Sequence, residues 1–189
     1  TEEAQKDEVI GRLLNYSEKL EGLYRNVATH AAEKCIQLGA TPLTLSDSGG
    51  FIHCADGLTQ EQVDWIKDLK GVRRGRISEA ADEFANITFH EGRPWGVEAD
   101  CAVPSATQNE VNAEEAATMI KNGIMAVAEA ANMPCEQGAV DAFMDANVMF
   151  GPAKAVNAGG VGVSGLEMSQ NSMRINWARD CLLYTSDAA

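Results

Sequence analysis

The chain has 189 residues, 45% of them hydrophobic and 23% charged, which suffices for one ordinary domain and excludes two large ones. Its formal net charge of -13 argues against broad, sequence-independent binding to nucleic acid. No stretch approaches the roughly 20 apolar residues of a membrane span, and no basic-then-apolar leader opens the chain. We therefore expect a cytoplasmic protein with neither nucleic-acid nor membrane partners.

The cysteines and histidines do not form a metal-binding pattern. The five cysteines are widely spaced and include no C-x-x-C pair, so we interpret them as reduced thiols of a reducing compartment. The three histidines have no partner at metal-ligand spacing. The sequence thus predicts no metal site.

Helices and strands are expected to alternate along most of the chain. Residues 1–20 have the apolar stripe of an amphipathic helix, and residues 26–38 repeat it. Capping-box spacings predict helix starts at Thr59 and Asn112. The expected strands are 43–45, 87–89, 99–103, 125–128 and 148–150, and further helices are expected at 77–84 and 136–144. Because the strands are largely apolar and no tight two-residue hairpin turn separates them, we predict an α/β, Rossmann-like fold, with a mostly parallel sheet and helices on both faces.

Polar residues follow three of the expected strands. They are Ser46-Asp47-Ser48, Thr107-Gln108-Asn109 and the stretch 129–132. In parallel α/β sheets, ligands bind beyond the carboxyl ends of the strands, so these tips are the candidate site. Each tip taken singly reads equally well as a solvated turn.

The segment Gly160-Val161-Gly162-Val163-Ser164-Gly165 spells the G-x-G-x-x-G of dinucleotide-binding loops. That loop requires a strand before it, and a helix with a further strand after it. The segment instead follows the last expected strand, and no strand follows it. We therefore predict that it does not bind a dinucleotide phosphate.

Several long motifs identify a resemblance. They are Pro94-Trp95, Ala106-Thr107-Gln108-Asn109-Glu110, and the stretches 128–134, 157–161 and 164–171. Together they resemble hexameric NADP-type glutamate dehydrogenase over about residues 20–179. The resemblance implies a partial dinucleotide-binding domain at 26–156 and a hinge with the start of a return helix at 157–180. It implies NADP as cofactor, with NAD second, and reversible oxidative deamination of glutamate to 2-oxoglutarate and ammonia by a homo-hexamer.

The resemblance also assigns site residues. Asn26 matches the end of the phosphate loop, and Lys70, Arg73 and Arg76 match basic positions for the ribose 2'-phosphate. Thr107, Gln108 and Asn132 would contact the nicotinamide ribose and its surroundings, and Asn157 would lie near the nicotinamide. Val161 and Ser164 would contact the substrate. The alternatives are a solvated basic helix end for the cations and a glycine-rich helix start, capped by Ser164, for the hinge.

Asp47 is a candidate cofactor-binding residue because of its spacing in the sequence and not because of the family resemblance. It lies 22 residues after Arg25, near the separation at which dinucleotide folds place an acid on the adenosine ribose. Such an acid favours NAD, whereas three cations against one carboxylate favour NADP. We expect Lys70, Arg73 and Arg76 to turn toward Asp47 at one rim of the sheet.

The sequence departs from the family at its phosphate loop. Leu23 and Arg25 stand at the two loop glycines, and about six residues of the first strand, roughly 20 Å of extended chain, are missing. A residue with a side chain forced to positive φ costs about 1–2 kcal/mol. We therefore expect weak NADP binding from a degenerate first strand and loop.

The two ends of the chain lack family counterparts. Residues 1–25 form an uncertain helical segment without the family's catalytic lysine motifs, so we assign no catalytic residue and expect no turnover by this polypeptide alone. Residues 181–189 are interpreted as a sequencing artefact. Two other functions remain open: a branched-chain or aromatic amino-acid dehydrogenase, against which Ser164 argues, and a non-catalytic nucleotide-fold module, which the Leu23-Tyr24-Arg25 replacement favours.

Overall fold

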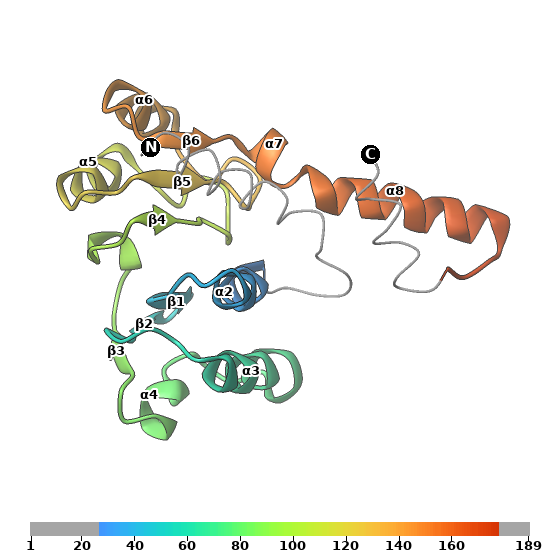
Figure 1. Cartoon of the computed structure of the whole chain (residues 1–189), viewed down its shortest axis with the longest axis horizontal. Coiled ribbons are helices and arrows are strands. Elements are labelled where there is room, and N and C mark those ends of the chain that lie inside the picture. Colours follow the sequence, from blue (N-terminus) through green and yellow to red (C-terminus); the bar gives the residue numbers. More distant parts are fainter. Residues whose placement is uncertain (1–26, 178–189) are drawn as a thin grey trace.

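Two three-stranded sheets form the centre of the protein in a computed structural model that describes residues 27–177 (Figure 1). An antiparallel sheet has the order β1 (Thr44–Asp47), β2 (Gly50–His53) and β3 (Thr88–His90). A parallel sheet has the order β4 (Cys101–Ala102), β5 (Ala126–Ala128) and β6 (Met149–Gly151). The α/β class with parallel strands is confirmed. Asn26, Leu23, Arg25 and the expected helix at 1–20 lie outside the described residues, as do residues 181–189.

A two-residue hairpin joins β1 to β2, so the expectation that no such turn occurs was wrong. Asp47 pairs with Gly50 across the turn, and the Asp47 Oδ1 accepts the Gly49 N–H at 2.8 Å. Gly50 has a φ of +149°, and a Cβ there would lie 2.3 Å from the carbonyl oxygen of His90. The same glycines that we interpreted as the end of a strand therefore connect two antiparallel strands.

Three helices accompany the antiparallel sheet: α2 (Val27–Gln37), α3 (Gln60–Asp68) and α4 (Glu79–Glu83). The predicted capping box at Thr59 is confirmed, because its hydroxyl accepts the Gln62 N–H while the Gln62 side chain accepts the Thr59 N–H. A π-helical turn, η2 (Leu69–Arg73), prolongs α3. The core of this half contains Ala32, Leu45, Ile52, Cys54, Leu58, Val63, Ile66, Ile77, Ala80 and Ile87.

The parallel sheet packs with α5 (Ala113–Lys121) and α6 (Gln137–Asp145). The capping box predicted at Asn112 is also confirmed, with Glu115 as its partner. A second, separate core contains Val111, Ala116, Met119, Ile124, Val127, Cys135, Ala139, Phe143 and Val148. A short 3-10 helix, η3 (Pro94–Gly96), lies on the connection between the two sheets, and its Trp95 packs against this second core.

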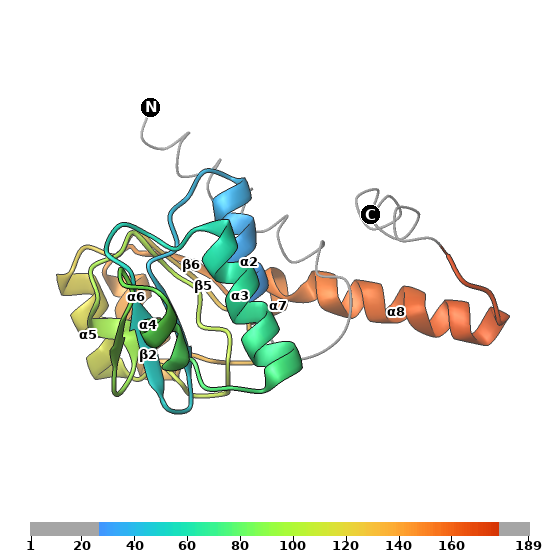
Figure 2. The same cartoon turned by 90° about the horizontal axis from the view of Figure 1, so that it is seen from below.

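The chain continues after β6 through α7 (Ala153–Val156) into α8 (Ala158–Met173). Helix α8 extends away from the sheets in both views (Figures 1 and 2). The G-x-G-x-x-G match at 160–165 lies inside this helix, which confirms that it is not a loop between a strand and a helix. Among the described helices, none is long and apolar enough to cross a membrane.

Candidate functional site

Asp47 is the centre of a polar cluster at the carboxyl end of β1. Its Oδ2 accepts bonds from Lys70 Nζ at 2.7 Å and from the Ile77 N–H at 3.0 Å, and its Oδ1 accepts the Gly49 N–H at 2.8 Å. Burial raises the pKa of Asp47, but the hydrogen bond from Lys70 and the two backbone N–H groups outweigh it, so the pKa lies below its ordinary value. Asp47 is therefore an ionised carboxylate whose acceptors are already engaged.

Two of the three expected cations reach this cluster. Lys70 bridges Asp47 and the Gly75 carbonyl oxygen at 3.1 Å, and Arg76 Nη1 donates to the Ser48 hydroxyl at 2.9 Å. The turn at Arg74, which has a φ of 56°, ends η2 and reverses the chain between these two residues.

Arg73 is engaged elsewhere, contrary to the expectation that all three cations turn toward Asp47. Its guanidinium carbon lies 4.3 Å from the centre of the Trp65 ring, and its Nε donates to Asp68 at 2.9 Å. An aromatic face and a carboxylate on the same helix satisfy the guanidinium locally. Lys70 and Arg76 therefore belong to the cluster around Asp47, whereas Arg73 lies against two side chains of α3.

The cluster therefore has a lower net positive charge than the three cations and one carboxylate that the sequence predicted. Glu79 also joins it, because Glu79 Oε1 accepts the Arg76 N–H at 2.7 Å. The cluster therefore contains two cations, Lys70 and Arg76, and two carboxylates, Asp47 and Glu79. Among the described residues, Arg76 forms no ion pair, which leaves its exposed guanidinium available to an anion.

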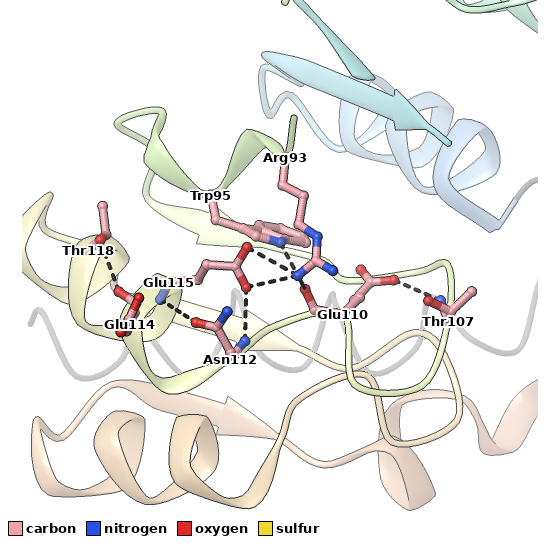
Figure 3. A network of polar contacts seen from close by, with 8 residues as sticks. All are labelled: Arg93, Trp95, Thr107, Glu110, Asn112, Glu114, Glu115 and Thr118. Carbon is pink, nitrogen blue, oxygen red and sulfur yellow. Dashed lines mark hydrogen bonds and ion pairs between the residues drawn. The ribbon is translucent and has the colours of Figure 1, made fainter. Parts of the chain in front are cut away.

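The second polar tip is held in shape by Glu110 (Figure 3). Its Oε2 accepts the N–H groups of Ala106 at 2.9 Å and Thr107 at 2.7 Å. Its backbone carbonyl accepts Arg93 Nη1 at 2.7 Å and Trp95 Nε1 at 3.3 Å. The loop that carries Thr107 and Gln108 is thereby fixed to η3, and both residues remain exposed.

The third tip is organised by Glu129, which directly follows β5. Its side chain is buried, with only 6% of the residue exposed. Its two oxygens accept the N–H groups of Cys135 at 3.1 Å and Ala153 at 2.8 Å. Asn157 adds a bond to the Ala131 carbonyl oxygen at 3.2 Å, so this loop and the start of α7 are connected. We missed Glu129 as a positioning residue, although an acid immediately after an apolar strand was a visible signal.

A cavity of about 1250 Å³ opens beside these tips. Its walls include all four residues of β1 and both residues of β4, together with one side of α2. Ser46, Asp47 and Lys70 line it, and Ser105 and Ala106 line its other side. The structure thus brings the first tip to this cavity together with Ser105 and Ala106, which precede the second tip, whereas Thr107, Gln108 and Asn109 are not among the residues that line it. Within the described part of the chain, no three histidine, cysteine or acidic side chains are grouped to hold a metal ion.

Comparison with known proteins gives the family. The sequence profile described as Glutamate/Leucine/Phenylalanine/Valine dehydrogenase matches residues 15–183. The chain belongs to this dehydrogenase family. It is 52% identical over 155 residues to the NAD(P)-specific glutamate dehydrogenase of Xylanibacter ruminicola, covering 82% of this chain and 35% of that protein. It is 46% identical over 155 residues to the NADP-specific glutamate dehydrogenase of Haemophilus influenzae, covering 82% and 34%.

A solved structure agrees with the sequence comparison. The crystal structure of Plasmodium falciparum glutamate dehydrogenase superposes with a TM-score of 0.80 at 40% identity, covering 85% of this chain and 35% of that one. The chain therefore spans about 35% of the length of the glutamate dehydrogenases that it matches. It is a partial representative of the family.

The residues that the family resemblance assigned to the nicotinamide and the substrate lie apart from the cavity walls. Asn132 is exposed on the loop after β5. Val161 is 72% exposed on α8, and the Ser164 hydroxyl donates to the Gly160 carbonyl oxygen of the same helix at 2.9 Å. Their roles remain predictions.

Proposed function

We propose that this chain is the cofactor-binding part of an NADP-dependent glutamate dehydrogenase. The intact enzyme would convert glutamate, water and NADP⁺ reversibly to 2-oxoglutarate, ammonia, NADPH and a proton, as a homo-hexamer in the cytoplasm. The observation that carries the proposal is the cluster of Asp47, Lys70, Ser48 and Arg76 at the carboxyl end of β1. The glutamate dehydrogenases at 46–52% identity support glutamate over an apolar substrate.

Arg76 is the residue best suited to the ribose 2'-phosphate. A guanidinium is always charged and offers paired donors that match phosphate geometry. Lys70 acts differently, because its ammonium is held by Asp47. It neutralises a carboxylate that would otherwise repel the phosphate by about 4 kcal/mol at 4 Å, at an effective dielectric of 20. When bound, the cofactor supplies the nicotinamide that accepts hydride from the substrate.

Thr107, Gln108, Asn132 and Asn157 are proposed to face the nicotinamide half of the cofactor. Glu110 and Glu129 would position them, because their carboxylates fix the two loops through backbone N–H groups. Val161 and Ser164 would contact the substrate, with the Ser164 hydroxyl changing its acceptor from the helix carbonyl to a substrate carboxylate. The hinge at 157–180 would bring α8 to the site.

Titration of the purified chain with NADPH and NADH, followed by NMR chemical shifts, tests the cofactor assignment. We expect NADPH to bind more tightly than NADH, and Arg76→Ala to weaken NADPH about tenfold without affecting NADH. Arg73→Ala is the matched control, since its guanidinium lies on Trp65, and it should change neither constant more than about twofold. Equal binding of the two cofactors, or equal losses in the two variants, would contradict the proposal.

A further inference from the structure

Two residues with a left-handed backbone lie in the loops that follow β4 and β5. The described residues other than glycine that have a positive φ are Arg74, Asn109, Met133, Asn147 and Arg174. Three of them follow the ends of η2, α6 and α8, where this conformation is ordinary. Asn109, with a φ of 56°, and Met133, with a φ of 50°, end no helix. Their loops follow neighbouring strands of the parallel sheet, so both residues lie near the second and third polar tips.

The backbone of Met133 is the more strained of the two. Asparagine adopts the left-handed conformation several-fold more often than most residues, whereas methionine has no such preference. Packing of the side chain does not compensate, because Met133 is 51% exposed. Strained residues of this kind persist where the surrounding structure holds them in place, and they gather at functional sites. The bonds made by the backbone around Met133 therefore decide why it has this conformation.

These bonds join the two loops in a short parallel ladder. The Asn109 N–H donates to the Met133 carbonyl oxygen at 3.0 Å, and the Val111 N–H donates to the Pro134 carbonyl oxygen at 3.0 Å. Val111 and Cys135 form a parallel bridge, and both belong to the core of the parallel sheet. The ladder is thus anchored in the core at Val111, and its exposed end is the bond between the two left-handed residues.

Gln108 lies between two residues whose backbone is held. The Thr107 N–H donates to Glu110 Oε2 at 2.7 Å (Figure 3), and the Asn109 N–H donates to Met133. Gln108 itself is exposed, and no other residue in the range 27–177 bonds to its side chain. The loop after β4 therefore presents one amide side chain from a fixed backbone.

Asn132 has the same setting in the loop after β5. The carbonyl oxygen of Ala131 accepts Asn157 Nδ2 at 3.2 Å, and the carbonyl oxygen of Met133 accepts the Asn109 N–H. Asn132 is also exposed, and its side chain has no bond to the part of the chain that the structure describes. Each loop thus presents one exposed amide side chain directly beside the bond that the loops share.

We propose that Asn109 and Met133 are positioning residues whose shared bond sets the relative position of Gln108 and Asn132 for the nicotinamide half of the cofactor. The inference rests on the proposed function. The carboxylates described above fix each loop to its own surroundings, whereas this bond fixes the two loops to each other. A ligand that contacts both amides binds more tightly when their separation is set beforehand, because binding then does not have to order the loops.

The variant Asn109→Val in the full chain tests the proposal, because a β-branched residue disfavours the left-handed backbone. Hydrogen exchange of the N–H at position 109 should be about tenfold faster, and NADPH should bind about tenfold more weakly in an NMR titration. Adenosine 2',5'-bisphosphate, which has the 2'-phosphate but no nicotinamide, should bind within about twofold of the wild type. Asn109→Gly, which adopts a positive φ without strain, should restore NADPH binding.

A matched control and a second variant separate positioning from loss of structure. Asn147→Val makes the same substitution at a φ of 55°, in the turn between α6 and β6. It should lower thermal stability similarly and leave both affinities within about twofold of the wild type. Met133→Val should weaken NADPH binding about tenfold, and the double variant of Asn109 and Met133 should also lose about tenfold rather than about a hundredfold, because both substitutions disrupt one bond.

Several results would overturn the positioning role. They are wild-type NADPH affinity in both the Asn109 and Met133 valine variants, multiplicative losses in the double variant, an equal NADPH loss in Asn147→Val, and a parallel loss of bisphosphate binding in Asn109→Val. Equally tight binding of the bisphosphate and NADPH to the unaltered chain would refute the positioning role alone, because the nicotinamide half would then make no contact. Failure of the unaltered chain to bind either ligand would refute the proposed function and the positioning role with it.

Discussion

Replacing Glu129 by glutamine tests whether this buried carboxylate fixes the loops after β5 and β6. Its two oxygens accept the N–H groups of Cys135 and Ala153. Glutamine keeps the shape and one acceptor, but turns an NH₂ group toward the second N–H. A bond to a charged group contributes about 1.5–3 kcal/mol, so we expect a loss of about 2 kcal/mol, which corresponds to about thirtyfold faster local exchange.

Hydrogen exchange of the Cys135 and Ala153 amides measures this change where it occurs. Glu136→Gln is the matched control, because it makes the same charge change at an exposed position whose side chain forms no cap bond. That variant should alter stability by less than about 0.5 kcal/mol. Wild-type exchange rates at both amides in Glu129→Gln, or an equal acceleration in Glu136→Gln, would refute the reasoning.

Three further predictions concern titration and packing. The pKa of Asp47 is lowered in the folded protein from an ordinary value of 3.8. The contribution of Asp47 to the free energy of unfolding is therefore fully present above about pH 4 and is lost as the pH falls through the lower pKa of the folded state. Urea unfolding should show this acid loss in the wild type, and Asp47→Asn should lack it. Cys101 is an exposed residue of β4, but partial desolvation of its thiol, with the nearby Asp100 carboxylate, raises its pKa to about 11. Iodoacetamide should therefore modify it slowly at pH 8 and faster at higher pH; the rate of an unperturbed thiol at pH 8 would contradict this. Gly50→Ala should cost about 2 kcal/mol in thermal unfolding because its Cβ would meet a β3 carbonyl, whereas Gly160→Ala in open helix should be neutral or stabilising.

Local signals in the sequence predicted much of the fold. Both capping boxes begin helices where Thr59 and Asn112 predicted them, because a cap involves residues three apart. The apolar strands 125–128 and 148–150 also correspond to the parallel strands β5 and β6. The hairpin was missed because Ser48-Gly49 can end a strand or turn it back, and only the pairing of Asp47 with Gly50 distinguishes the two.

The candidate site was less predictable, because its side chains bond to partners that are distant in the sequence. Lys70 and Arg73 are equivalent in sequence as cations near a helix end, yet Lys70 meets Asp47, 23 residues away, and Arg73 lies over Trp65. Glu129 is bonded to the backbone 24 residues further along. Spacing in the sequence does not predict these partners. Those of Lys70 and Arg73 depend on the direction of the chain at the turn formed by Arg74.

The division of the apolar interior into two clusters, one beneath each sheet, has a consequence for cooperativity. Each half contains its own strands, helices and buried side chains, so each satisfies the conditions for a separate folding unit. Calorimetry should therefore resolve two heat-absorption peaks for the free chain rather than one. A strand that bridged the halves would couple them into a single melting event.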